Sequence, residues 1–254
     1  MPPHCNCRYL LGHQKRMQYI LLATDYDGTL AHDGVVDTAT LSALDRLRAS
    51  GRKLVLVTGR HLPDLTKVFP QLDLFDRVVV ENGGVFYCPK SGKEKLLCEP
   101  PNPRFLELLR ERDVPFTAGR TVVATWRPHD TVMLSAIRDL GLDLHVIFNK
   151  ESVMVLPSGV DKRTGLQAAL RELRISPSNV VGVGDAENDL PFLRMSGLSA
   201  AVANALPSVK KEADVVLDKP RGEGVINLID ALLSDDLSHC EAKLRSIESS
   251  SALG

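Results

Sequence analysis

Residues 25–30, Asp-Tyr-Asp-Gly-Thr-Leu, carry two carboxylates two positions apart, after an apolar run at 19–23 and before a glycine. This order predicts paired acids at the end of a buried strand, facing a pocket. Two aspartates this close repel one another unless a cation joins them, and the usual cation is a hard divalent metal with oxygen ligands. The spacing also lets one aspartate attack a substrate while the other transfers a proton. The alternative is an Asx-rich turn after a strand, which is a common structural use of these residues.

Length, charge and cysteine usage narrow the class of protein. The 254 residues suffice for one large domain or two modest ones, and a net charge of −1 gives no basic footprint for nucleic acid or an anionic membrane. No stretch approaches the roughly 20 apolar residues that span a bilayer. Five scattered cysteines do not suggest a secreted disulfide framework, so we expect a cytoplasmic protein.

The two ends differ in composition from the rest. We predict a disordered extension at residues 1–17, which lack the apolar centre of a signal peptide, and a Ser-rich, charged tail at 236–254. Cys5 and Cys7 with His4 and His13 suggest a metal site as an alternative. There is no second ligand pair at a recognised spacing, which favours the extension.

Strands and helices alternate through much of the chain. Apolar runs at 19–24, 53–57, 77–80 and 180–183 predict strands, and helical spacing of leucines predicts helices such as 38–50 and 162–173. This strand–helix–strand order indicates an α/β fold, with helices on both faces of a parallel sheet. We assign residues 18–84 and 157–235 to this core.

The pattern changes between the two parts of the core. We expect a hairpin formed by 85–88 and 95–98, helices at 104–112 and 131–140, and strands at 121–126, 145–148 and 152–156. Short strands and helices in this order predict a small α+β domain on an antiparallel sheet. Residues 85–156 are therefore predicted to be a domain inserted into the core.

Polar clusters occur where predicted core strands end or where the chain re-enters the core. In parallel α/β sheets, ligands bind outside the carboxyl ends of the strands. Each cluster also has a structural alternative, such as an ordinary turn, a solvated lysine or a helix cap. Their joint occurrence favours one shared site. The clusters are Asp25/Asp27, Thr58-Gly59-Arg60, Lys162 and Asp185/Asn188/Asp189.

With these residues the chain resembles the haloacid dehalogenase superfamily of phosphohydrolases, and within it the Cof-type subfamily IIB. The resemblance covers about residues 19 to 235, with motifs at 25–30, 57–60, Lys162 and 184–189. The first and fourth motifs are specific when found together, whereas the second and third are weak alone. Glu81-Asn82-Gly83-Gly84 also looks like a turn usual in this subfamily. The resemblance implies a Rossmann-like core with an inserted α+β cap.

The resemblance also implies phosphoryl transfer in two steps, with Mg²⁺ as the cofactor. It implies that Asp25 attacks phosphorus and forms an aspartyl-phosphate, and that Asp27 acts as acid and then as base. The implied phosphate-binding residues are Thr58, Gly59, Lys162 and Asn188. The implied metal ligands are Asp25, the backbone carbonyl of Asp27, Asp185 and Asp189.

The cap is expected to set specificity. Arg60 and Arg127 are the retained candidate substrate contacts, and the wider cap set is Arg120, Trp126, His129, Asn149 and Lys150. The resemblance implies a small phosphorylated metabolite, such as a sugar phosphate or phosphoglycolate, no nucleic-acid or membrane partner, and a monomer or homodimer. One alternative is a phosphosugar mutase, which returns the phosphoryl group to its substrate. Another is a non-enzymatic phosphosugar-binding protein, which predicts a lost nucleophile or metal ligand.

Overall fold

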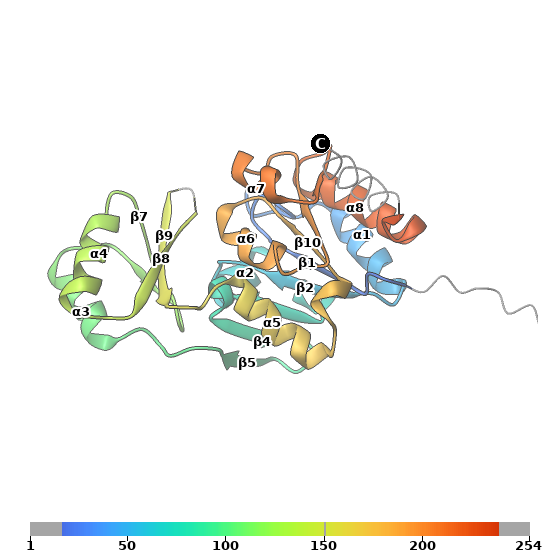
Figure 1. Cartoon of the computed structure of the whole chain (residues 1–254). Coiled ribbons are helices and arrows are strands. Elements are labelled where there is room, and N and C mark those ends of the chain that lie inside the picture. Colours follow the sequence, from blue (N-terminus) through green and yellow to red (C-terminus); the bar gives the residue numbers. More distant parts are fainter. Residues whose placement is uncertain (1–16, 150, 239–254) are drawn as a thin grey trace, which may run out of the picture.

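The computed structural model describes residues 17–149 and 151–238. Within these residues, a large α/β core and a smaller α+β cap lie next to each other (Figure 1). No helix of this part of the chain is both long and apolar enough to cross a membrane. Residues 1–16 of the predicted extension and 239–254 of the predicted tail lie outside the described residues.

The core is built on a sheet with the strand order β12-β11-β10-β1-β2-β3-β4-β5. Pairing is parallel from β12 through β3, and β4 and β5 are antiparallel. Strand β1 is buried along its whole length, as expected where helices cover both faces of a parallel sheet. The bounds are β1 Leu21–Thr24, β2 Lys53–Val57, β3 Arg77–Val80, β4 Val85–Cys88, β5 Lys93–Leu96, β10 Val180–Gly184, β11 Leu198–Ala201 and β12 Val215–Val216.

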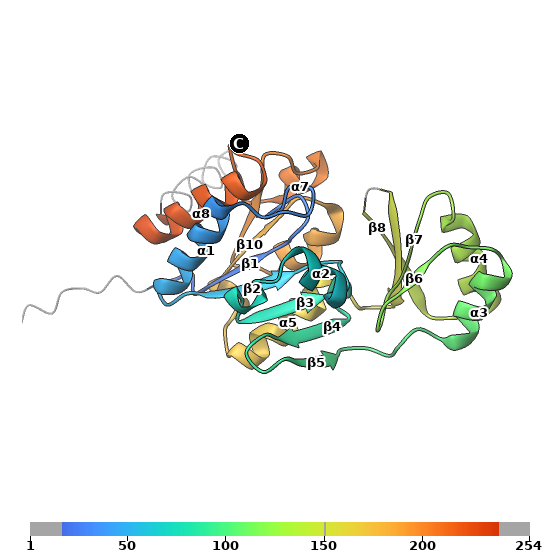
Figure 2. The same cartoon turned by 180° about the vertical axis from the view of Figure 1, so that it is seen from behind.

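Helices cover both faces of this sheet (Figures 1 and 2). Helices α1 (Thr38–Ala49) and α8 (Arg221–Asp235) pack together on one face, and α5 (Lys162–Leu173) and α6 (Leu190–Leu193) lie on the other. Helix α5 begins at a capping box, in which Asp161 accepts from the N–H of Thr164 at 2.9 Å. This cap places Lys162 in the first turn of α5. The remaining core helices are α2 (Leu62–Val68) and α7 (Pro207–Glu212), with short 3₁₀ turns η1 Leu72–Leu74, η2 Glu81–Gly83, η3 Pro177–Asn179 and η4 Glu187–Asp189.

The cap is a four-stranded antiparallel sheet with the order β6-β7-β9-β8. One face packs against its own two helices through residues such as Phe105, Met133 and Val153. The opposite face carries Met154 and is turned toward the core (Figure 1). The bounds are α3 Pro103–Glu111, β6 Thr117–Ala118, β7 Val123–Trp126, α4 Asp130–Asp139, β8 Leu144–Asn149 and β9 Ser152–Pro157. The predicted α/β core with an inserted α+β cap is confirmed.

The hairpin expected in the cap belongs to the core, so the predicted assignment of residues 85–98 to the cap is wrong. Strand β4 pairs with β3, with Val79 opposite Phe86, and β5 extends the same sheet. The tight η2 turn reverses the chain directly after β3, so the next strand completes the free edge of the core sheet. Burial of Val85 and Phe86 holds it there.

Residues 236–238 of the predicted tail pack on the core. Leu237 is buried, and Asp236 accepts a hydrogen bond from Nη2 of the buried Arg52 at 2.9 Å. Arg52 also donates to the carbonyl of Leu232 in α8 at 2.9 Å. The core therefore extends beyond residue 235, the boundary expected from composition.

Candidate active site

The carboxyl ends of the central core strands meet beneath the cap sheet. Strand β1 pairs with β2 on one side and with β10 on the other, so the strand order reverses at β1. Ligands of α/β proteins bind at such a reversal, outside the strand ends. A pocket of about 260 Å³ lies here. Its lining residues are Asp25, Asp27, Thr58, Gly59, Arg60, His61 and Asp64 from the core, and Thr117, Ala124, Asn149, Ser152 and Met154 from the cap.

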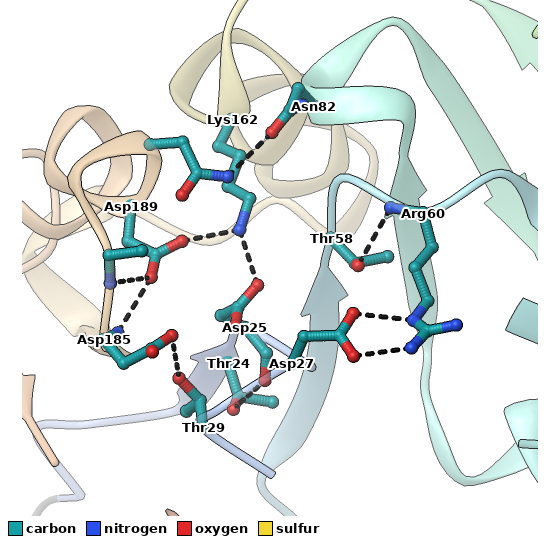
Figure 3. Close-up of polar contacts among 12 residues, drawn as sticks. Thr24, Asp25, Asp27, Thr29, Thr58, Arg60, Asn82, Lys162, Asp185 and Asp189 are labelled. Carbon is teal, nitrogen blue, oxygen red and sulfur yellow. Dashed lines mark hydrogen bonds and ion pairs between the residues drawn. The ribbon is translucent and has the colours of Figure 1, made fainter. Parts of the chain in front are cut away.

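Asp25 and Lys162 form a buried ion pair at the base of this pocket (Figure 3). The ammonium of Lys162 donates to Oδ1 of Asp25 and to Oδ1 of Asp189, both at 2.5 Å. Burial, together with the charges of Asp189 and Asp185, raises the pKa of Asp25 well above its ordinary value, and Lys162 only partly opposes this. Burial lowers the pKa of Lys162, but the charges of Asp189 and Asp25 outweigh it and raise that pKa.

Three buried carboxylates, Asp25, Asp185 and Asp189, form what we call the acid cluster. One oxygen from each lies within 4.8 Å of the others. Asp189 is held in place because its Oδ2 accepts from the backbone N–H groups of Asp185 at 2.8 Å and Ala186 at 3.0 Å (Figure 3). Lys162 is the cation that pairs with Asp25 and Asp189 of this cluster. A group of carboxyl oxygens that outnumbers its cationic partners suits a divalent metal ion.

Gly28 allows the first motif to approach the acid cluster closely. Its φ of +86° lies in the left-handed region, where side chains are rarely accommodated. A Cβ atom at this position would lie 2.4 Å from Oδ2 of Asp185. The glycine after Asp27 is therefore required by both its backbone conformation and the contact across the site.

Asp27 and Arg60 form a second charged group, which we call the rim pair. Nε and Nη2 of Arg60 donate to the two oxygens of Asp27, each at 2.6 Å (Figure 3). The guanidinium also lies over the ring of Tyr26, 5.4 Å from its centroid. The side chain of Asp27 is 41% exposed, so it faces the pocket mouth and its carboxylate is not part of the acid cluster. A contribution of Asp27 to a metal site through its backbone carbonyl stays a prediction.

Thr58 and Gly59 precede Arg60 of the rim pair and line the same pocket as Asp25. Thr58 is buried, lines the pocket and accepts from the N–H of Arg60 at 3.1 Å. Its carbonyl accepts from the N–H of Asn82 at 3.1 Å. Gly59 packs against the side chain of Asn82, and a Cβ there would lie 3.1 Å from its Nδ2. The structure therefore brings the predicted phosphate-binding loop next to Asp25.

Asn188 and Arg127 lie toward a neighbouring pocket of about 680 Å³. Asn188 donates to Oδ1 of Asn82 at 3.0 Å, and its own buried Oδ1 has no hydrogen-bond partner within the described residues. Arg127 lies over the ring of Phe148, 5.1 Å from its centroid, and is not among the residues that line the pocket of Asp25. Contact of Arg127 with a substrate on Asp25 therefore stays a prediction.

Of the wider set of cap candidates, the structure places one in the pocket of Asp25 and shows other contacts for three. Asn149 lines the pocket of Asp25. Trp126 and His129 pack edge to face on each other, with centroids 5.8 Å apart, and Arg120 pairs with Glu94 at 3.3 Å. Lys150 lies outside the described residues.

Several residues of the site were not predicted as site residues from the sequence. Asn82 bridges the predicted phosphate-binding loop, Asn188 and the cap, where its Nδ2 donates to Sδ of Met154 at 2.8 Å. His61 follows Arg60 directly and lines the same pocket. The Glu-Asn-Gly turn was the available signal for Asn82, and the position directly after Arg60 was the available signal for His61. Thr117, Ser152 and Met154 reach the pocket only through the placement of the cap and had no local signal.

Comparison with known proteins agrees with this geometry. Residues 22–118 and 136–229 match the model of the haloacid dehalogenase-like hydrolase family. Phosphoglycolate phosphatase 2 of Saccharolobus solfataricus is 31% identical over 223 residues, which cover 85% of this chain and 93% of that protein. The phosphoglycolate phosphatase of Methanopyrus kandleri is 31% identical over 231 residues, which cover 85% and 97%. A haloacid dehalogenase-like hydrolase from Bacteroides thetaiotaomicron shares the fold with a TM-score of 0.71 at 20% identity, covering 84% of this chain and 99% of that one. The chain belongs to the haloacid dehalogenase-like hydrolases, in their Cof-type group.

Proposed function

We propose that this phosphoric monoester hydrolase releases phosphate from a small phosphorylated metabolite, with Mg²⁺ and through an aspartyl-phosphate. The observation that carries the proposal is the buried carboxylate of Asp25, 2.5 Å from the ammonium of Lys162 and in one pocket with Thr58. A carboxylate in this position can attack phosphorus while the lysine and the threonine hydroxyl bind the phosphoryl oxygens.

The residues present fit a magnesium ion. Asp25, Asp185 and Asp189 would hold it, with the carbonyl of Asp27 as a further oxygen ligand. When bound, the ion would offset the repulsion between a carboxylate nucleophile and a phosphate dianion. Lys162 supplies the same kind of compensation from its position between Asp25 and Asp189.

The proposed reaction has two steps in which Asp25 and Asp27 have different roles. In the first, Asp25 forms a bond to phosphorus, the ester P–O bond breaks, and Asp27 gives a proton to the leaving oxygen. In the second, Asp27 takes a proton from water, the water oxygen bonds to phosphorus, and the bond to Asp25 breaks. This step releases phosphate and regenerates the free carboxylate of Asp25.

The pair between Asp27 and Arg60 is expected to loosen during this cycle. Both oxygens of Asp27 accept from Arg60, and protonation of one oxygen removes the negative charge that strengthens these hydrogen bonds. We expect the guanidinium to move toward the substrate when Asp27 acts as the acid. The rim position of the pair leaves space for this exchange, since the side chain of Arg60 is 28% exposed.

The cap face of the pocket suits a small polar leaving group. Thr117, Asn149 and Ser152 present hydroxyl and amide groups, and the pocket holds only about 260 Å³. Oδ1 of Asn149 is buried without a partner within the described residues and can accept from a substrate hydroxyl. The relatives named phosphoglycolate phosphatases make phosphoglycolate, beside sugar phosphates, a leading candidate substrate.

A phosphate-release screen over phosphoglycolate, sugar phosphates and an aryl phosphate tests the proposal. We expect Mg²⁺-dependent turnover that EDTA removes reversibly. Asp25→Asn should lower kcat by about 10⁴-fold or more because the nucleophile is lost. The exposed Asp73→Asn on η1 is the matched control and should retain wild-type activity.

Wild-type turnover by the Asp25→Asn protein would contradict the mechanism. Recovery of an isomerised phosphosugar in place of free phosphate would replace hydrolysis by the mutase alternative.

A further inference from the structure

The corner that follows β3 has an unusual backbone. Glu81 and Asn82 have φ angles of +53° and +50°, and both are buried. Consecutive non-glycine residues in the left-handed region are costly, and such conformations persist where surrounding contacts require them. The phosphatase mechanism described above uses neither side chain, so their contacts call for another explanation.

The carboxylate of Glu81 is bound by the cap. Its two oxygens accept hydrogen bonds from the backbone N–H groups of Arg120 at 3.0 Å, Thr121 at 2.8 Å and Val122 at 3.2 Å. They also accept from the hydroxyl of Thr121 at 2.8 Å. These donors belong to residues 119–122, the cap turn, which connects β6 to β7. A core carboxylate thus accepts the hydrogen bonds of a cap segment that lies about 40 positions further along the chain.

The same residue is also bound to the phosphate-binding loop. The N–H of Glu81 donates to the carbonyl of Arg60 at 3.0 Å, and Nδ1 of His61 lies 3.4 Å from Oε1. Burial raises the pKa of Glu81, but the hydrogen bonds from His61, Arg120 and Thr121 outweigh this and lower it to about 2. The group is therefore a carboxylate at neutral pH, and its hydrogen bonds to the cap are charge-assisted.

Close packing leaves little freedom where the cap turn meets the core. A Cβ at Gly119 would lie 2.4 Å from Nδ1 of His61 and 2.7 Å from Cδ of Glu81. Thr117 and Ala124, which line the pocket of Asp25, lie two residues before and two residues after the cap turn. A displacement of the cap turn would therefore move the leaving-group side of the pocket.

We propose that Glu81 is a positioning residue of the active site, whose carboxylate seats the cap turn on the loop that carries Thr58 and Arg60. Through this contact, the core sets the distance between the groups that bind phosphate and the cap groups that face the leaving group. The consequence for catalysis rests on the proposed phosphatase function, whereas the seating of the cap does not.

Glu81→Gln in the full chain, with Glu94→Gln as the matched control, tests the seating. Glu94 pairs with the side chain of Arg120 across the same boundary, but at a more exposed position and without backbone donors. In Glu81→Gln, we expect amide hydrogen exchange of residues 120–122 to be about tenfold faster or more, because a carboxamide cannot accept all four donors. Glu94→Gln should leave that exchange unchanged.

Hydrolysis of p-nitrophenyl phosphate with saturating Mg²⁺ tests the effect on catalysis. We expect Glu81→Gln to raise KM by about tenfold while kcat changes by less than about threefold, because the cap contacts only the leaving-group side. Glu81→Asp keeps the charge with a shorter side chain and should fall between wild type and Glu81→Gln in both measurements. If the Glu81→Gln protein does not fold, Glu81→Asp is used in its place for both measurements.

The outcomes separate the two ideas. Unchanged exchange of residues 120–122 in Glu81→Gln would overturn the seating of the cap. Faster exchange with unchanged KM would overturn the positioning role, and so would an equal rise in exchange across core and cap with a proportionate fall in Tm. Absence of hydrolysis by the wild-type protein would count against the phosphatase proposal alone, since the exchange measurement does not depend on turnover.

Discussion

The acid cluster and the rim pair each take one aspartate from the six-residue segment 25–30, yet the two groups differ in burial and partners. Asp25 is 5% exposed and lies among Lys162, Asp185 and Asp189 at the ends of core elements. The side chain of Asp27 is 41% exposed, and both of its oxygens accept from the guanidinium of Arg60. The acid cluster is fixed by buried contacts within the core, whereas the more exposed rim pair has room to rearrange when a substrate binds.

The largest expected effect is on the buried region. Lys162→Met should lower the free energy of unfolding by about 3–5 kcal/mol in EDTA, because it leaves Asp25 and Asp189 buried without their cation. Urea unfolding at neutral pH measures this. Lys67→Met, at a side chain that is 77% exposed, should change stability by less than about 0.5 kcal/mol. Equal stability of the two variants would show that the buried pair does not balance the acid cluster.

Magnesium should act on the acid cluster and not on the rim pair. At 100 times its dissociation constant, Mg²⁺ should raise the free energy of unfolding by about 2.7 kcal/mol through preferential binding to the folded state. Thermal unfolding with and without Mg²⁺ measures the change. Asp185→Asn should remove most of it, because one ligand charge is lost. A wild-type Tm that does not respond to Mg²⁺ would contradict the assignment of the cluster.

A third change tests the rim pair. Arg60→Lys keeps the charge but cannot hold both oxygens of Asp27, so we expect kcat to fall about tenfold. Stabilisation by Mg²⁺ should stay at its wild-type value. Arg46→Lys, at an exposed arginine of α1 that pairs with Asp230, is the matched control and should have little effect on kcat. A loss of Mg²⁺ stabilisation in Arg60→Lys would remove the distinction between the two regions.

The smallest expected effect is a pH dependence at the border with the cap. The hydrogen bond with Glu81 raises the pKa of His61 against the opposing effect of burial, and the charges of Glu81 and Asp64 add to it. Because the folded-state pKa is higher than the ordinary 6.5, the stabilisation is complete below pH 6.5 and is lost as pH rises through the folded-state value. The free energy of unfolding, measured with urea, should be higher for wild type than for His61→Gln by about 0.5–1.5 kcal/mol at pH 6 and by less at pH 9. A difference that grows with pH would contradict this sign.

The sequence predicted the residues whose signals are local. Asp25, Thr58, Lys162 and Asp185 each stand at a strand end or helix start that periodicity and glycines reveal. The parallel order of the core strands then requires that these positions meet at one edge. The hairpin at β4 and β5 was assigned to the wrong domain because its partner depends on which sheet edge is free, and this is a property of the assembled fold.

Spacing and residue type by themselves determined the α/β core, the inserted cap and the residues that form the acid cluster. They did so because strand periodicity and turn chemistry act over a few residues. The tertiary structure decided that Asp27 is held by Arg60, that Glu81 binds the cap turn, and which cap side chains enter the pocket. The first two contacts join residues 33 to 41 positions apart, and their partners are selected only when distant segments of the chain pack together.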